Sequence, residues 1–189
     1  MPTPDWLAKP TLTGQLVQLR PFAEDDLPAM AEALTDPDVM KLTGSVHSWR
    51  EAAARRPGAD EAFLAWYRTR NQAEDRLDLA IVDLKTRACV GEAVLNDYSQ
   101  ANSSCNFRIL IGPKGRDRGL GSEATTLMIR YGLDVLGLHR IELSVYSFNP
   151  RAQRVYEKTG FQVEGRLRHA FRFDDEWIDT VLMSVLATD

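Results

Sequence analysis

The stretch GRDRGLGSE, Gly115–Glu123, sets three glycines and two arginines between an apolar run, 107–112, and a helix-like run, 124–136. A helix begins with several backbone N–H groups that lack partners, and it carries a partial positive charge there. Glycine lets an anion approach these N–H groups closely, and arginine adds charge-assisted hydrogen bonds. This junction of strand and helix therefore predicts a pyrophosphate site, with a plain turn and solvated arginines as the alternative.

Composition and motif spacing narrow the function classes. The 189 residues suit one domain, and a net charge of −4 does not indicate a general nucleic-acid-binding surface. The opening stretch lacks both the Gly-Lys-Ser/Thr of a Walker loop and the offsets of GxGxxG. Cys89, Cys105 and the three scattered histidines have no metal-ligand spacing, so we expect reduced thiols and no metal site. No apolar run has the length of a membrane span and MPTPDWLAKP does not resemble a signal peptide, so we expect a cytoplasmic protein.

Hydrophobic periodicity predicts the elements on the N-terminal side of the stretch. We expect residues 1–13 to be loosely held, and we divide the chain into an N-terminal arm, 1–15, and a single domain, 16–187. Three acids at Glu24–Asp26, followed by apolar residues at helical spacing, predict a helix start. The expected order is a strand at 16–19, a helix to 34, turns over 36–50, a helix over 59–72, and strands at 77–82, 90–95 and 107–111.

On the C-terminal side, apolar residues at three- and four-residue spacing predict one buried helix face that ends before Gly137. These residues are Leu120, Ala124, Leu127, Met128, Tyr131 and Val135. A strand over 141–145 follows, then the cap Asn149-Pro150, a helix over 151–158, and a hairpin that turns near Asp174-Asp175. Helices placed among hairpin-linked strands predict an α+β fold.

Several ordered motifs resemble one enzyme superfamily. RDRGLG, 116–121, resembles the Arg/Gln-x-x-Gly-x-Gly/Ala motif of the GNAT superfamily of acyl-CoA-dependent N-acetyltransferases. LHRIELSVYSFNPRAQRVYEKTGFQVEGRLR, 138–168, is similar to the branch that includes the bacterial ribosomal-protein N-terminal acetyltransferases. That branch typically carries His-Arg, Asn, Glu-Lys-x-Gly-Phe and Glu-Gly-x-Leu-Arg in this order. LRPF, 19–22, matches the usual entry of the branch, so the resemblance covers roughly residues 16–187.

The resemblance implies a mixed, strongly bent central sheet with flanking helices and a V-shaped splay between the two middle strands. Acetyl-CoA, as co-substrate, would lie in that gap, with strand backbone along its pantetheine arm and the helix N-terminus around its pyrophosphate. Arg151 and Arg154 would reach the phosphates or face solvent. No metal is implied. The implied cofactor-binding residues are Ile109, Leu110, Ile111, Arg116, Asp117, Arg118, Gly119, Leu120, Gly121, Ser122, Asn149, Arg151 and Arg154.

The implied reaction is direct attack of a primary amine on the thioester in a ternary complex, where positioning supplies much of the rate. A backbone N–H of Leu110 or Ile111 would stabilise the carbonyl oxygen. Tyr156 stands where many members have a tyrosine that protonates the departing thiolate. The alternative is that the Tyr156 ring only packs against the cofactor.

The sequence departs from its relatives at the position of the base. The branch commonly has Glu-Ile-Gly-Tyr where this chain has NFRI, so Asn106 replaces the usual carboxylate and Arg108 replaces a glycine. An ordered water or an amine of low pKa could make a side-chain base unnecessary. The candidate substitutes are Glu92, which we take as a catalytic residue, Asp97, and Ser147 acting through a water.

The resemblance identifies the donor and leaves the acceptor open. The acceptor could be a protein N-terminus or a small-molecule amine such as a polyamine or an aminoglycoside; the rival is a non-catalytic acyl-CoA-binding module. We expect the acceptor between residues 27–60 and the final hairpin, 168–177. No nucleic-acid or membrane partner is expected, and the helix over 59–72 or the hairpin could serve a homodimer. Acidic residues that could attract a cationic amine there are Glu61, Asp174, Asp175 and Glu176.

Overall fold

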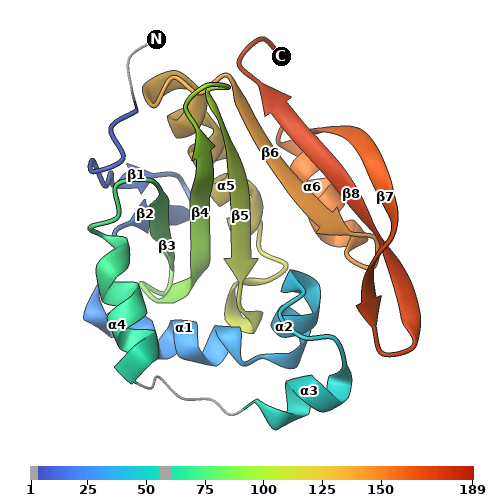
Figure 1. Cartoon of the computed structure of the whole chain (residues 1–189). Helices are drawn as coiled ribbons and strands as arrows, with labels where there is room; N and C mark the ends of the chain where they lie inside the picture. The colour runs from blue at the N-terminus through green and yellow to red at the C-terminus, as the bar shows by residue number, and fades with distance from the viewer. Residues whose placement is uncertain (1–3, 56–60) are drawn as a thin grey trace.

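The computed structural model describes residues 4–55 and 61–189, and within them eight strands form one sheet (Figure 1). Their order across the sheet is β1-β2-β3-β4-β5-β6-β8-β7. Neighbouring strands are antiparallel except β5 and β6, which are parallel, so the mixed sheet of an α+β fold is confirmed. The strands are β1 Leu12–Thr13, β2 Val17–Arg20, β3 Leu77–Asp83, β4 Cys89–Ser99, β5 Ser104–Ile111, β6 Arg140–Tyr146, β7 Gln162–Phe173 and β8 Glu176–Leu186.

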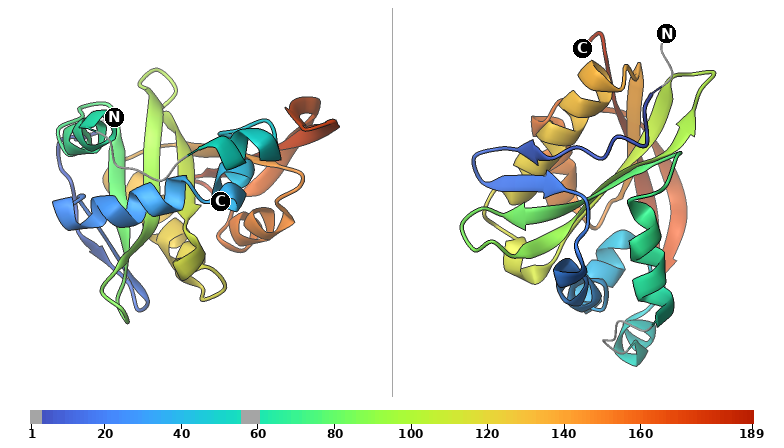
Figure 2. Two further views of the ribbon diagram at one scale, coloured as in Figure 1. Left: turned by 90° about the horizontal axis from the view of Figure 1, so that it is seen from below. Right: turned by 90° about the vertical axis from the view of Figure 1, so that its left-hand side faces the viewer.

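Helices cover both faces of this sheet (Figure 2). α5 and α6 pack against one face, while α1 and α4 pack against the other. Residues 59 and 60 of the predicted second helix lie outside the described residues. The described helices are η1 Glu24–Asp26, α1 Leu27–Leu34, α2 Pro37–Thr43, α3 Trp49–Ala54, α4 Glu61–Arg70, η2 Pro113–Gly115, α5 Leu120–Arg130, the π-helical turn η3 Tyr131–Val135, and α6 Pro150–Lys158.

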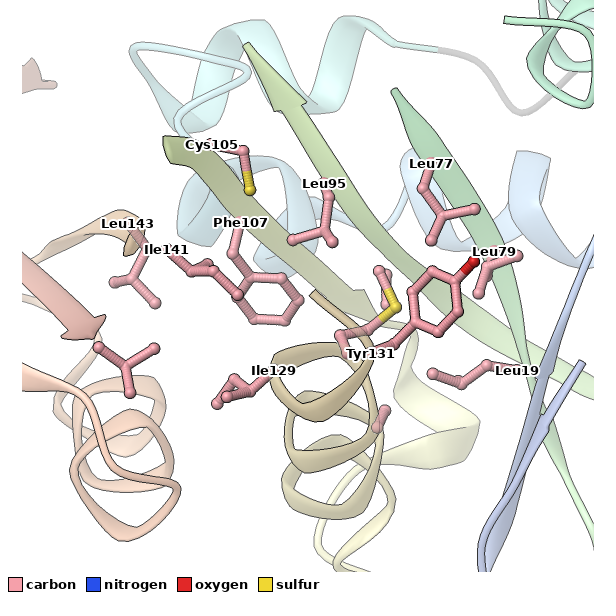
Figure 3. Packing of buried hydrophobic residues seen from close by; sticks show 14 of the residues in the cluster. Leu19, Leu77, Leu79, Leu95, Cys105, Phe107, Ile129, Tyr131, Ile141 and Leu143 are labelled. Carbon is pink, nitrogen blue, oxygen red and sulfur yellow. The ribbon is translucent and has the colours of Figure 1, made fainter. Parts of the chain in front are cut away.

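Strand alternation sends the side chains of the central strands into two separate cores, and a third core lies between the β7–β8 hairpin and the helices α2 and α3. In β3, Leu79 and Ile81 face the core under α5, whereas Ala80 faces α1 and α4. Figure 3 shows Ile129 packed beneath Phe107 in the larger core. Because both faces are covered, the central strands read as nearly continuous apolar runs.

The two middle strands separate partway along their length. β5 and β6 pair only at Ser104↔Arg140, Cys105↔Ile141 and Asn106↔Glu142. Beyond these pairs β5 continues against β4 as far as Ile111, and β6 continues against β8 as far as Tyr146. The predicted V-shaped splay is therefore confirmed, and it exposes one edge of β5 and one edge of β6.

The turns predicted over 36–50 are wrong, because this segment contains α2 and the start of α3. The Asp36 carboxylate accepts a hydrogen bond from the Val39 N–H at 2.9 Å, and the Ser48 hydroxyl accepts one from the Glu51 N–H at 3.0 Å. Both residues are helix N-caps. Of the turn signals that we interpreted, Asp36-Pro37 begins α2 and Thr43-Gly44 ends it, with Gly44 as the C-cap. Both helices are too short to show a clear apolar period.

The loosely held arm is also wrong for the residues that the structure describes. Trp6 is 5% exposed and packs in the larger core, against Tyr98. The Lys9 ammonium donates hydrogen bonds to the carbonyl oxygens of Ala73 and Arg76 at 2.7 and 2.8 Å. One apolar anchor and one partly buried ammonium thus hold a segment whose composition suggested a free tail.

Val135 does not lie on the buried face of its helix. The chain leaves α5 through a π-helical turn, in which the Leu136 N–H donates to the Tyr131 carbonyl five residues earlier. This turn takes one more residue than an α-helical turn, so it rotates the following side chains. Val135 is consequently 67% exposed, and Leu136 takes the buried position at 4%.

The last residue of the opening stretch, Glu123, joins α5 to the N-terminal strands. Its carboxylate accepts hydrogen bonds from the N–H groups of Gln15, Leu16 and Val17 at 2.8, 2.7 and 2.8 Å. Partial burial disfavours the charged form, but the three donors together outweigh it and lower the pKa of Glu123. The carboxylate therefore holds the β1–β2 turn against the first turn of α5.

We expect Glu123→Gln to lower the free energy of unfolding by about 2 kcal/mol, because the amide NH2 faces backbone donors where an oxygen accepted before. The wild-type advantage is present above the ordinary pKa of 4.5 and is lost as the pH falls through the lowered pKa. Urea unfolding at neutral and acid pH measures both effects. The matched control is Glu157→Gln, since the Glu157 carboxylate is exposed on α6 and accepts a side-chain hydrogen bond from Gln153 at 2.9 Å. Equal stability of the two variants at neutral pH would contradict the assignment.

Candidate active site

A cavity of about 740 Å³ lies where β5 and β6 separate. Its wall combines the free edge of β5, the N-terminal turn of α5, the end of β6, the start of α6, and residues of α2 and α3. Two of the predicted site residues, Arg118 and Arg154, are not part of this wall. The predicted site residues that do line the cavity are Glu92, Ile109, Leu110, Ile111, Arg116, Asp117, Gly119, Leu120, Gly121, Ser122, Asn149, Arg151 and Tyr156.

The turn before α5 directs backbone N–H groups at the cavity. Gly119 is the N-cap with φ of 79°, a left-handed conformation that favours glycine. Leu120, Gly121 and Ser122 form the first helical turn, where N–H groups have no partner within the helix. All four residues line the cavity, so the helix N-terminus opens onto it.

Both arginines of the opening stretch form ion pairs with carboxylates. Arg116 contacts Asp36 at 3.0 Å, which ties the turn to the N-cap of α2. Arg118 reaches the buried Asp83 at 2.7 Å, so its guanidinium lies away from the cavity. These contacts leave the positive end of the helix, rather than Arg118, as the anion-facing feature of the turn.

The other predicted phosphate contacts come from the start of α6. The Asn149 side-chain oxygen accepts a hydrogen bond from the Ala152 N–H at 3.1 Å, so this residue is the N-cap of α6. Arg151 pairs with Asp117 at 3.0 Å across the cavity mouth and is half exposed. The ion pair links the two helix N-termini that border the cavity.

Tyr156 projects from α6 into the same cavity. Its side chain is 8% exposed and packs edge-on against Phe107 and Phe161. Burial raises the pKa of the Tyr156 hydroxyl to about 12. The phenol is therefore protonated at neutral pH and can serve as a hydrogen-bond or proton donor.

Glu92 is a carboxyl group buried in the cavity wall, at 3% exposure. Burial raises its pKa, although the Arg108 guanidinium at 3.4 Å and the Tyr67 hydroxyl at 3.0 Å both favour the charged form. Tyr67 comes from α4 and is 1% exposed. A carboxyl group whose pKa is raised takes up a proton more readily than an ordinary exposed carboxylate does.

The remaining candidates for the base lie elsewhere. Asp97 and Ser147 are not in the cavity wall. Asn106 is in the wall and donates a hydrogen bond to the Asn96 side-chain oxygen at 2.9 Å. Among the candidate carboxylates, Glu92 is thus the one that the structure brings to the cavity.

The acidic residues expected to attract the acceptor do not line the cavity. Glu61 pairs with Arg68 at 3.1 Å, and Asp175 pairs with Arg172 at 3.4 Å. Residues 56–60 of the expected acceptor region lie outside the described residues. Four residues that line the cavity were not predicted as site residues. They come from distant segments, and no local sequence pattern indicates that they lie close together: Lys41, Trp49, Tyr146 and Phe148.

Both cysteines are buried free thiols, and burial raises the pKa of each to about 12. Over residues 4–55 and 61–189, no group of three or more His, Cys, Asp or Glu side chains could hold a metal ion. In the same part of the chain, no helix has the length and apolarity needed to cross a membrane.

Comparisons with known proteins agree with this geometry. Spermidine N(1)-acetyltransferase of Escherichia coli strain K12 is 28% identical over 177 residues, which cover 89% of this chain and 85% of that relative. Ribosomal protein uS5-alanine N-acetyltransferase of the same strain is 31% identical over 86 residues, 46% of this chain and 44% of that relative. The solved structure of spermidine N-acetyltransferase from Vibrio cholerae, in complex with CoA and spermine, shares the fold. It has a TM-score of 0.77 and 22% identity, and the match covers 93% of this chain and 98% of that one.

Residues 17–162 match the family described as the acetyltransferase (GNAT) domain. The match includes the splayed strands, the turn before α5 and the helix that carries Tyr156. The alternative of a non-catalytic module is not supported by these relatives, which are acetyltransferases. The chain belongs to the GNAT acetyltransferase family and is an acetyl-CoA-dependent N-acetyltransferase.

Proposed function

We propose that this enzyme acetylates a primary amine of a small aliphatic polyamine, with Glu92 as the base and Tyr156 as the acid. The observation that carries the proposal is the buried carboxyl group of Glu92 in the cavity wall. A cationic amine must lose a proton before it can attack a carbonyl carbon, and a carboxylate of raised pKa is suited to take it.

The residues around the splay fit the extended, anionic shape of acetyl-CoA. The unpaired edge of β5 beyond Asn106 offers backbone groups to an amide-bearing arm. The N-terminal turn of α5, with Gly119 as its cap, offers N–H groups and a partial positive charge to a pyrophosphate. Asn149 and Arg151 border the same cavity and would complete the binding site.

The chemistry balances with two protein groups. Glu92 accepts the proton of the acceptor ammonium, and the amine nitrogen forms a bond to the acetyl carbon. The bond between that carbon and the CoA sulfur breaks, and Tyr156 donates its proton to the sulfur. The nitrogen loses its second proton as the amide forms, and this proton restores the Tyr156 hydroxyl through solvent. A backbone N–H of Leu110 or Ile111 would stabilise the carbonyl oxygen. Both residues lie on the free edge of β5 and line the cavity.

The extent of similarity supports the proposed acceptor class. The spermidine-acetylating relative aligns over 177 residues, including the segments that form both ends of the cavity. The protein-acetylating relative aligns over 86 residues. A protein N-terminus is the second candidate, favoured by the higher identity of 31% in that shorter stretch.

Acceptor profiling tests the proposal. At fixed acetyl-CoA we expect kcat/KM for spermidine to exceed that for a peptide with an N-terminal alanine by about 10²-fold, because the site would bind the distal ammonium as well. Thiol release measures both reactions, and an aminoglycoside completes the panel. Preference for the peptide would overturn the polyamine assignment and support the second candidate.

A further inference from the structure

The side-chain ammonium of Lys41 lies among three aromatic rings. Its nitrogen is 4.8 Å from the ring centroid of Trp49, 5.3 Å from that of Phe148 and 4.7 Å from that of Phe173. All three distances are within the range of about 6 Å over which a ring face attracts a cation. We call the three rings the Lys41 box.

Four separate segments build the box. Lys41 comes from the last turn of α2, Trp49 from α3, Phe148 from the loop after β6, and Phe173 from the end of β7. Trp49 and Phe173 meet edge to face, with centroids 5.3 Å apart and planes at 86°. The Asp174 N–H donates to the His47 carbonyl at 2.7 Å, which fastens the loop before α3 to the β7–β8 turn. The rings are therefore held in place by backbone contacts as well as by packing.

The box opens into the acetyl-transfer cavity. Lys41, Trp49 and Phe148 line the same cavity as Glu92 and Tyr156. Within the described residues, no carboxylate lies at ion-pair distance from the Lys41 ammonium, so the rings are what holds this cation. A lysine side chain ends in a CH2–NH3+ group, which is also the end of an aliphatic polyamine.

We propose that the Lys41 box is an alkylammonium subsite of the acceptor, and that Lys41 is a tethered competitor which the acceptor's distal ammonium displaces. The inference rests on the proposed polyamine acceptor, because a second cationic group is what the box would bind. A tethered lysine is present at a high effective concentration, so it weakens the binding of every free ligand to the box. Lys41 would then set the threshold for acceptor binding rather than take part in the chemistry.

Tetramethylammonium is a probe that binds aromatic boxes and cannot be acetylated. We expect Lys41→Met to increase its affinity at least about fivefold over wild type, since removing the resident cation frees the three ring faces. Trp49→Leu in the Lys41→Met background should reverse the gain, and Phe148→Leu gives an independent second variant. The measurement is a titration of indole N–H resonances at constant ionic strength, with sodium chloride as the exchanged salt.

Two controls separate the box from general charge effects. Lys158→Met removes the lysine in the last turn of α6, outside the cavity, and should leave tetramethylammonium binding unchanged. Trp66→Leu removes a ring that Arg70 covers at 4.4 Å on α4, also outside the cavity. Equal tetramethylammonium affinity in wild type and in folded Lys41→Met would overturn the inference.

Kinetics with spermidine keep this inference distinct from the proposed function. In Lys41→Met, the KM for spermidine should fall about fivefold with kcat unchanged, the pattern expected when only binding is altered. Tighter tetramethylammonium binding without spermidine turnover would support the box and overturn the polyamine acceptor. If spermidine is turned over but its KM is the same in wild type, Lys41→Met and Trp49→Leu, the box is not an acceptor subsite. The proposed polyamine acceptor would still stand.

Discussion

Tyr156→Phe is expected to lower kcat roughly 10²-fold while the KM for acetyl-CoA stays unchanged. The substitution keeps the ring that packs against Phe107 and Phe161 and removes only the hydroxyl. Because burial raises the pKa of Tyr156 to about 12, the phenol is protonated throughout the neutral range and has a proton to give to the departing thiolate. Initial rates of thiol release at saturating acceptor measure the loss.

The same variant decides between the two roles that the sequence left open for Tyr156. A residue that only packs against the cofactor would keep its kcat as phenylalanine, and full turnover would remove the acid assignment. Tyr131→Phe is the matched control, because Tyr131 is also 8% exposed yet does not line the cavity. We expect this control to keep wild-type kinetics.

Sequence patterns predicted the parts of the site that depend on local backbone structure. Gly119 is recognisable because the turn before α5 needs a left-handed residue, and Asn149 because a capping residue followed by proline begins a helix. The positions of strands and helices around the splay depend on the same short-range rules. These signals span only a few residues, so they can be interpreted without knowing the fold.

Side-chain directions and long-range contacts could not be predicted in the same way. Arg116 and Arg118 belong to one motif, but partners 80 residues and more than 30 residues away in sequence draw them to Asp36 and Asp83. The three rings around Lys41 also come from distant segments, and no sequence periodicity indicates that they pack together. Such contacts depend on tertiary packing, which overrides local preference.

Glu92→Gln is expected to lower kcat/KM for the acceptor roughly 10²–10⁴-fold at neutral pH, because the amide cannot take the ammonium proton. In the wild type, kcat/KM should rise with pH through the raised pKa of Glu92. The variant should lack this rise and should instead follow the neutral fraction of the amine, whose pKa is about 10.4. The difference in kcat/KM between wild type and Glu92→Gln therefore becomes smaller as the pH approaches the pKa of the amine.

The substitution should leave the fold intact at neutral pH. A buried carboxyl group whose pKa is raised costs stability once the pH exceeds its unfolded pKa, so a neutral amide of the same size removes that cost. The Arg108 side chain is half exposed and can be solvated when its partner becomes neutral. Thermal unfolding of the variant checks this point before the kinetics are interpreted.

Two further variants test whether the pH dependence belongs to Glu92. Tyr67→Phe removes the hydrogen bond that favours the Glu92 carboxylate, so the pKa of Glu92 should rise and the acid limb of kcat/KM should move to higher pH. Asp83→Asn changes another buried carboxylate, which pairs with Arg118 at 2.7 Å, does not line the cavity and is not among the groups that shift the pKa of Glu92. The folded fraction of that variant should show the acid limb of kcat/KM at the same pH as the wild type. An acid limb of kcat/KM that persists in Glu92→Gln and does not shift in Tyr67→Phe would assign the base to another group, because both substitutions act on the carboxyl group of Glu92.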